Sequence, residues 1–119
     1  MYTYSFEKLE VWKESKDFTK EIYNVTSTFP DDEKFGLTSQ MRRAAVSICS
    51  NIAEGSARKT NKDKAHFTTI SFGSSVEVLN QLILALELDF IAMDTYQNLR
   101  KQLESITNKL NSLRNHQTK

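Results

Sequence analysis

Apolar residues recur at alternating steps of three and four along most of the chain, which is the spacing of one face of an α-helix. The pattern predicts four helices, over residues 6–28, 36–54, 61–90 and 95–114. The last has the simplest pattern, one apolar stripe separated by polar residues: Tyr96, Leu99, Leu103, Ile106, Leu110 and Leu113. Helices of this length with short connections predict an all-α, antiparallel up-down-up-down four-helix bundle that forms a single domain, residues 1–119.

The two middle helices carry more apolar surface than a four-helix monomer needs. In the third, residues 78–91 are apolar around most of the helix circumference, which is typical of a helix buried on several sides. In the second, Val46, Cys49 and Ala53 stand where a solvated face would carry Lys and Glu. We therefore expect a further contact surface, most simply with a second copy, so the bundle is predicted to be the protomer of a homo-oligomer.

A polar stripe runs beside the apolar stripe of the second helix. Its members are Gln40, Arg43, Ser47, Asn51 and Glu54. If the turn between the second and third helices is centred near Arg58, Ser47 faces Thr69 and Arg43 faces Gly73, with Glu77 one turn further. We expect an Arg43–Glu77 ion pair inside a buried polar network that fixes the helix register. The alternative is a binding or catalytic site.

Two glycines are given structural roles by their positions. Gly73 lies in the middle of the third helix, where glycine costs about 1 kcal/mol relative to alanine. Close packing of a neighbouring helix over Gly73 and Ser74 would explain it. Gly55, at the end of the second helix, is expected to be a left-handed helix cap.

Charge is uneven along the chain, although sixteen basic and fifteen acidic residues leave only +1 overall. The densest positive group is Arg58, Lys59, Lys62 and Lys64, at the expected turn between the second and third helices. Such a group can contact phosphates with salt-dependent, sequence-independent affinity, and Arg42 is a further candidate. The alternative is a solvated turn.

Several classes of function receive no support from the sequence. His66, His116 and Cys49 lack the spacing of a metal site, and no phosphate-binding glycine loop or nucleophile–base pair is present. We expect no enzymatic activity, cofactor or small-molecule substrate. Cys49 is the single cysteine, which suits a reducing cytoplasm. The N-terminus lacks the pattern of a signal peptide, and residues 76–92 are expected to be too short and polar to span a membrane.

Four segments occur in an order and spacing that resembles a known family. They are FEKLEVW, FP followed by EKFGLTSQMRRAAVSI, NIAEG and GSSVE. Together they resemble the bacterial four-helix-bundle family encoded in intervening sequences of 23S ribosomal RNA genes. Some of its members carry a ribosomal-protein label, and a related branch includes the accessory protein of diversity-generating retroelements. The similarity extends from about Phe6 to Ile91.

The resemblance implies a homopentameric ring that associates with structured RNA or with a nucleic-acid-processing protein. It also implies recurrent positions, which in this chain are Gln40, Arg43, Ala44, Ser47, Asn51, Ile52, Ala53, Glu54, Gly55, Gly73, Ser74 and Glu77. One departure concerns Cys49, where many relatives have a proline that would remove a backbone donor and kink the helix.

The sequence leaves three hypotheses about function. The first is a non-enzymatic, homo-oligomeric bundle that acts as an RNA-associated accessory or scaffold protein, with Arg58, Lys59, Lys62 and Lys64 on phosphates. The second is a protein–protein interaction module without nucleic-acid binding. The third is an enzyme that uses Arg43, Glu54 and Glu77, which would need a solvent-accessible pocket around all three. Trp12 and Tyr23, beside the first apolar stripe, are expected to pack rather than to stack on bases.

Overall fold

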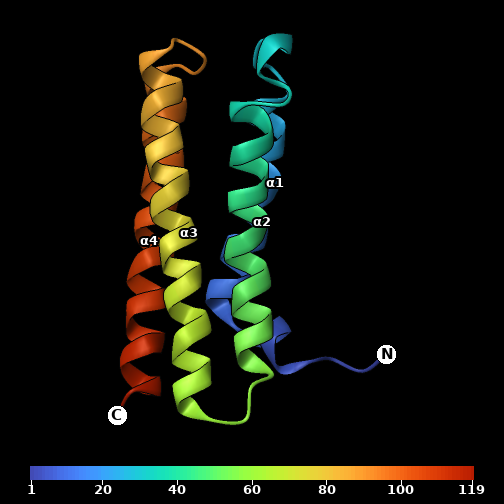
Figure 1. Ribbon diagram of the computed structural model, residues 1–119, viewed down its shortest axis with the longest axis vertical. Helices are drawn as coiled ribbons and strands as arrows, with labels where there is room; N and C mark the ends of the chain where they lie inside the picture. Colours follow the sequence, from blue (N-terminus) through green and yellow to red (C-terminus); the bar gives the residue numbers. More distant parts are fainter.

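The computed structural model describes residues 1–119 and contains helices but no strand. Its four long helices are α1 (Glu10–Thr26), α2 (Leu37–Ser56), α3 (Asn61–Glu87) and α4 (Met93–Gln117). They run antiparallel along the long axis of the molecule (Figure 1). Each helix packs against the next in sequence, and α4 packs back against α1, so the four close into a bundle. The predicted all-helical class, with four long helices, is confirmed.

The helix boundaries differ from the predicted ones mainly at the ends. The segment predicted as one helix over residues 6–28 is divided by Leu9, whose extended backbone separates a short 3-10 helix, η1 (Ser5–Lys8), from α1. A second 3-10 helix, η2 (Asp31–Glu33), follows Pro30. At the other end of the chain, α4 continues to Gln117, three residues beyond the predicted end.

The core contains the apolar stripes that the helical spacing predicts. Its fully buried side chains come from all four helices and include Phe18, Ile22, Met41, Ile48, Val78, Leu82, Leu99, Ile106 and Leu110. Burying an aliphatic or aromatic side chain of this size contributes about 1.5–3 kcal/mol. The stripe of α4 is buried from Tyr96 to Leu110, while Leu113 is only half-buried.

Two hydroxyl groups from neighbouring helices lie within hydrogen-bond distance of backbone carbonyls in the middle of α2. From α3, Ser71 Oγ donates to the carbonyl of Ile48 at 2.7 Å. From α1, Thr19 Oγ1 lies 3.2 Å from the carbonyl of Ala45 and 2.8 Å from the Ser15 carbonyl of its own helix, and its one proton is shared between them. α2 is continuous through Cys49, which is half-buried beside Thr19. Burial raises the pKa of the Cys49 thiol, so the thiol is protonated near neutral pH, as a small apolar residue would require.

α3 is long and apolar enough to cross a membrane when length and composition alone are considered. This differs from the expectation for residues 76–92, because the helix is counted from Asn61. The core helix of a bundle meets the same criteria, and α3 packs against both α2 and α4 here.

The turn from α3 to α4 is closed by an aspartate in the left-handed conformation. Asp89 has φ 61°, the one positive φ of a non-glycine residue in the chain. The Asp89 N–H donates to the Leu86 carbonyl at 3.0 Å and the Phe90 N–H to the Ala85 carbonyl at 2.9 Å. This is the pattern of a Schellman motif, in which glycine is the usual left-handed residue. The Phe90 ring then packs against Phe29, with ring centroids 5.4 Å apart.

Replacing Asp89 with glycine should raise the free energy of unfolding by about 0.5–1 kcal/mol, because glycine adopts positive φ without steric cost. Urea denaturation followed by circular dichroism measures this. Asp89→Val is the opposite control and should lower stability by about 1–3 kcal/mol, since a β-branched residue is strained in this conformation. Equal stability of the two variants would contradict the role given to this turn.

Candidate functional site

The polar stripe of α2 lies at the surface of the single chain. Gln40, Arg43, Glu54 and Glu77 are exposed, while Ser47 and Asn51 are half-buried. The predicted Arg43–Glu77 ion pair is not formed, since the one ion pair in the structure joins Lys109 to Glu14. The expectation of a buried network is therefore wrong for the isolated protomer.

A smaller polar cluster is formed where the stripe meets α3. Ser47 Oγ and Ser74 Oγ lie 2.8 Å apart, and the Asn51 amide donates to the Ser47 carbonyl at 2.9 Å and to Ser47 Oγ at 3.0 Å. Ser47 thus meets Ser74 rather than Thr69, a difference of five residues, or about one and a half helical turns. The predicted register assumed that α2 and α3 are symmetric about Arg58, whereas the helices are displaced along their axes.

Two open hollows flank Arg43. One, of about 650 Å³, is bordered by Gln40, Ser47, Ser74 and Glu77, and the other, of about 470 Å³, by Ser47, Asn51 and Glu54. Arg43 borders both, but Glu54 and Glu77 face different hollows. The structure therefore does not bring Arg43, Glu54 and Glu77 together around one pocket.

Close helix packing occurs at Gly55 and not at Gly73. A Cβ on Gly55 would lie 2.9 Å from the Cβ of Phe67 on α3, whereas a Cβ on Gly73 would meet no atom within 4 Å. No glycine has positive φ, and α2 continues one residue past Gly55. Both glycine predictions are therefore wrong within the protomer. NIAEG ends in glycine because α3 crosses there without room for a side chain.

Gly73 lies instead at the centre of an exposed face of α3, which we call the outer face. Its residues follow alternating steps of three and four and are His66, Thr69, Ile70, Gly73, Val76, Glu77, Asn80, Ile83, Leu84, Glu87 and Leu88. Val76 is 50% exposed, and Ile70, Ile83 and Leu84 are each more than one third exposed. This spacing is that of a helix seam that packs against another helix.

The basic residues of the α2–α3 connection gather at one end of the bundle, which we call the basic turn: Arg58, Lys59, Lys62 and Lys64. None of the four forms an ion pair. Arg58 lies over the ring of Phe67, 4.4 Å from its centroid, and Asp63 is the one acidic residue among them. Arg58, Lys59 and Lys62 are exposed, so three cations are free to contact an anion from solvent.

Lys64 differs from the other three because it is half-buried beside a cavity. The cavity has a volume of about 270 Å³ and lies where the end of α2, the start of α3 and the end of α4 meet η1. His116 borders it together with Lys64, and Thr68 Oγ1 closes one side by donating to Gln117 Oε1 at 2.7 Å. The first turn of α3 is fixed by Thr60 Oγ1, which accepts the Asp63 N–H at 3.1 Å.

The structure separates Arg42 from the basic turn. The Arg42 side chain reaches the C-terminal end of α1, where Nε donates to Thr26 Oγ1 at 2.8 Å and Nη2 to the Tyr23 carbonyl at 3.2 Å. Its guanidinium also lies over the Tyr23 ring, 4.7 Å from the centroid. Arg42 therefore adds a charged donor at the C-terminal end of α1, where a cation is stabilised by the helix dipole.

The other residues with potential chemistry lie apart. His66 is exposed on α3, His116 borders the cavity near the chain end, and Cys49 is half-buried in α2. No three His, Cys, Asp or Glu side chains are grouped as a metal ion would require.

The fold and these surfaces define the class of protein as an antiparallel four-helix bundle with an exposed helix face and a basic end. The sequence model of the family described as 23S rRNA-intervening sequence protein matches residues 7–112. The chain belongs to this family. A crystal structure of a protein of unknown function from the S23 ribosomal protein family of Bacteroides thetaiotaomicron has the same fold, with TM-score 0.82 and 23% sequence identity. The similarity covers 88% of this chain and 95% of that one. A search of curated protein sequences finds no match.

The two glycines should respond in opposite directions to substitution with alanine. Gly55→Ala should lower the free energy of unfolding by about 1–3 kcal/mol, because the new methyl group would overlap Phe67. Gly73→Ala is the matched control and should raise the stability of the single chain by up to about 1 kcal/mol, because the site is open and alanine favours helix. Urea denaturation at low protein concentration tests both. A Gly55→Ala protein as stable as the wild type would contradict close packing at this position.

Proposed function

We propose that the protein is a non-enzymatic helical bundle that assembles with copies of itself and acts as an RNA-associated accessory or scaffold protein. The observation that carries the RNA part is the basic turn, in which Arg58, Lys59 and Lys62 are exposed and form no ion pair. Lys and Arg in such an arrangement neutralise phosphates and release counterions, which gives affinity for nucleic acid without reading its sequence.

The outer face of α3 supports self-association. A coiled-coil-like seam is favoured when small or apolar residues recur every three and four positions, as Gly73, Val76 and Ile83 do. The open space at Gly73 would let another helix approach closely at the centre of the face. Asn80 lies on the same stripe, and a polar residue within an apolar seam restricts its register.

Charge also favours contact between copies. Residues 67–94, which include most of α3, contain four acidic residues and no basic residue. The exposed Arg43 on α2 and the exposed Glu77 on α3 are unpaired in the single chain. A contact in which α2 of one copy meets the outer face of α3 of the next would pair opposite charges. It would also use two different surfaces, and such head-to-tail contacts close into rings.

In a ring the basic turn would be repeated around one rim. A patch of four cations would become an annulus, which binds an extended or folded RNA at several points at once. The resemblance to the family implies five copies. Since Arg42 is held by α1, we assign the phosphate contacts to the basic turn alone.

The second candidate function is a protein–protein interaction module without nucleic-acid binding. The observation that favours it is the row of two open hollows beside Arg43, which could receive side chains of another protein. The two functions differ in their response to salt and to charge reversal at the basic turn.

Self-association should depend on the outer face of α3. The double variant Val76→Glu/Ile83→Glu should reduce the particle to the single-chain mass of 13.7 kDa, because it places added charge in the seam. Size-exclusion chromatography with light scattering measures the mass. Asn98→Glu/Asn111→Glu on the exposed face of α4 is the control and should leave the mass unchanged. A wild-type protein that is already monomeric at all concentrations would exclude the assembly.

RNA binding should depend on the basic turn. The triple variant Arg58→Glu/Lys59→Glu/Lys62→Glu should bind a labelled RNA stem-loop at least tenfold more weakly at about 150 mM salt, with the salt slope reduced by about three. Lys13→Glu/Lys20→Glu/Lys101→Glu has the same net charge and reverses exposed lysines elsewhere. Fluorescence anisotropy across a salt series compares the RNA affinities of the two triple variants, provided that both have the same oligomer mass. An equal loss of RNA affinity in both triple variants would indicate a general effect of net charge and reject the basic turn as the binding surface. Absence of RNA binding by the wild type would favour the protein-interaction module.

A further inference from the structure

An extended arm of four residues leaves the bundle at its N-terminus. Residues 1–4 have no regular secondary structure and point away from the helices (Figure 1). Their two tyrosines are largely exposed, Tyr2 at 76% and Tyr4 at 61%. Two large aromatic rings in water are unfavourable surface unless a ligand or partner covers them.

The arm is the end of a row of aromatic rings. The Tyr2 and Tyr4 rings are 4.9 Å apart between centroids and nearly perpendicular, and Tyr4 lies 6.4 Å from Phe6. Phe6 in turn meets Trp12 of α1 edge to face at 5.0 Å. The row leads from the half-buried Trp12 of α1 to the largely exposed Tyr4 and Tyr2 of the arm.

The direction of the arm is set by hydrogen bonds at its base. The Tyr4 N–H donates to Glu7 Oε2 at 2.8 Å, and the Glu7 N–H donates to the Tyr4 carbonyl at 3.1 Å. These bonds close η1 and occupy the Glu7 carboxylate. The arm therefore leaves the body at a fixed point, with its rings held by one another.

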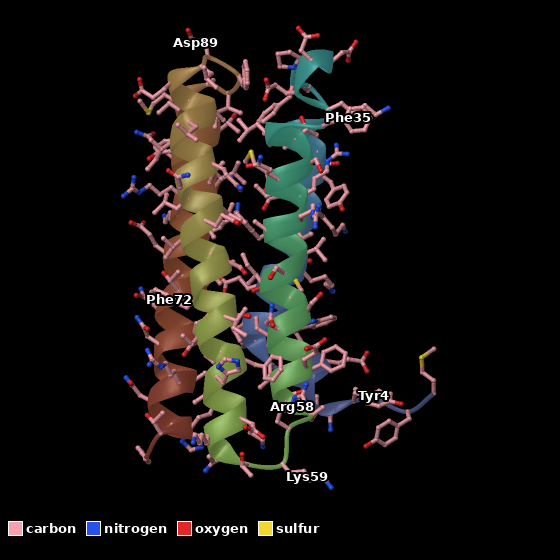
Figure 2. The ribbon with its side chains drawn as sticks, in the orientation of Figure 1. Tyr4, Phe35, Arg58, Lys59, Phe72 and Asp89 are labelled. Carbon is pink, nitrogen blue, oxygen red and sulfur yellow. The ribbon has the colours of Figure 1, made fainter.

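The arm lies at the same end of the bundle as the basic turn. Figure 2 shows Tyr4, Arg58 and Lys59 at one end of the bundle and Phe35 at the other. Arg58 and Lys59 carry unpaired positive charge, and Asp63 is the one acidic residue of the turn. Exposed aromatic rings next to free cations are the combination by which proteins hold single-stranded nucleic acid: bases stack on the rings while cations follow the backbone.

Phe35, at the other end, shows why the location of the arm matters. Its ring is 89% exposed, more than either tyrosine. Residues 31–34 hold three acids and one base, Lys34, whose ammonium lies 5.5 Å from the centroid of the Phe35 ring, so this segment is net acidic and repels phosphate. An exposed ring with one neighbouring cation therefore does not suggest RNA, whereas two exposed rings at the end that carries the basic turn do.

We propose that Tyr2 and Tyr4 form a stacking platform for unpaired bases of an RNA whose backbone lies on the basic turn. This inference rests on the proposed RNA association and adds the kind of RNA that is bound: single-stranded segments, with little preference among bases, since every base has a π-face. A duplex keeps its bases stacked on one another and contacts only the cations.

The test compares two RNAs on the full chain, an oligouridylate of about 12 nucleotides and a duplex of similar length. Tyr2→Ala/Tyr4→Ala should weaken binding of the single strand on the order of tenfold or more, while duplex affinity and the salt slope stay the same. Tyr2→Phe/Tyr4→Phe keeps the rings and should bind as the wild type does. Phe35→Ala removes an exposed ring at the acidic end and should change neither affinity.

Each other outcome overturns the inference in a distinguishable way. Unchanged single-strand affinity in the alanine variant, with duplex binding intact, rejects the arm and leaves the proposed function standing. A lower oligomer mass in the alanine variant assigns the arm to a contact between copies. Absence of binding to either RNA by the wild type rejects both the arm and the RNA association.

Discussion

The structure depends on how closely α1 and α3 approach α2. Small residues along α2, among them Ala44, Ala45 and Gly55, leave its backbone open on two sides, and α3 comes so close that the Cβ of Phe67 fills the place of a side chain at Gly55. At this distance the hydroxyls of Thr19 and Ser71 reach backbone carbonyls of α2. A larger residue on these faces would push the helices apart and lose these hydroxyl–carbonyl contacts together with the packing. The contact of α2 with α3 is also the most extensive in the bundle, so it fixes where the basic turn projects.

The surfaces left over after this packing have a common character. One side of α3 and the polar stripe of α2 expose apolar, small and unpaired charged residues, which a helix designed only for solvent would replace with mixed Lys and Glu. The basic turn and the aromatic arm lie at one end, while acidic residues of η2 lie at the other. The two ends of the molecule therefore differ in charge, so a ring of parallel protomers would have one basic rim and one acidic rim.

The sequence predicted the helices because each has a core stripe that repeats with helical spacing, and burial of Ile48, Leu82 and Ile106 follows that spacing. It could not predict the register of α2 against α3, because the apolar stripes of the two helices stay in contact when one helix slides along the other. The register is set instead by local packing, such as that of Phe67 against Gly55. This register explains why Ser47 meets Ser74 and why Gly73 is open. The contacts of Arg42 could not be predicted for a similar reason, because its partners, Thr26 and the Tyr23 carbonyl, lie on another helix, at the C-terminal end of α1. The aromatic arm was missed because no periodic pattern marks residues 1–4, although Tyr2 and Tyr4 stand next to a capping glutamate.

The position of the Thr19 hydroxyl beside the Ala45 carbonyl has a consequence for residue 49. In a regular helix the Ala45 carbonyl accepts the N–H of residue 49, which proline lacks. Here the Thr19 hydroxyl already lies 3.2 Å from that carbonyl, although its one proton is nearer the Ser15 carbonyl of α1, at 2.8 Å. Turning this proton to the Ala45 carbonyl would let proline replace Cys49 without leaving a buried carbonyl unsatisfied. A threonine at position 19 would then be a permissive residue, one that we expect to accompany proline at position 49.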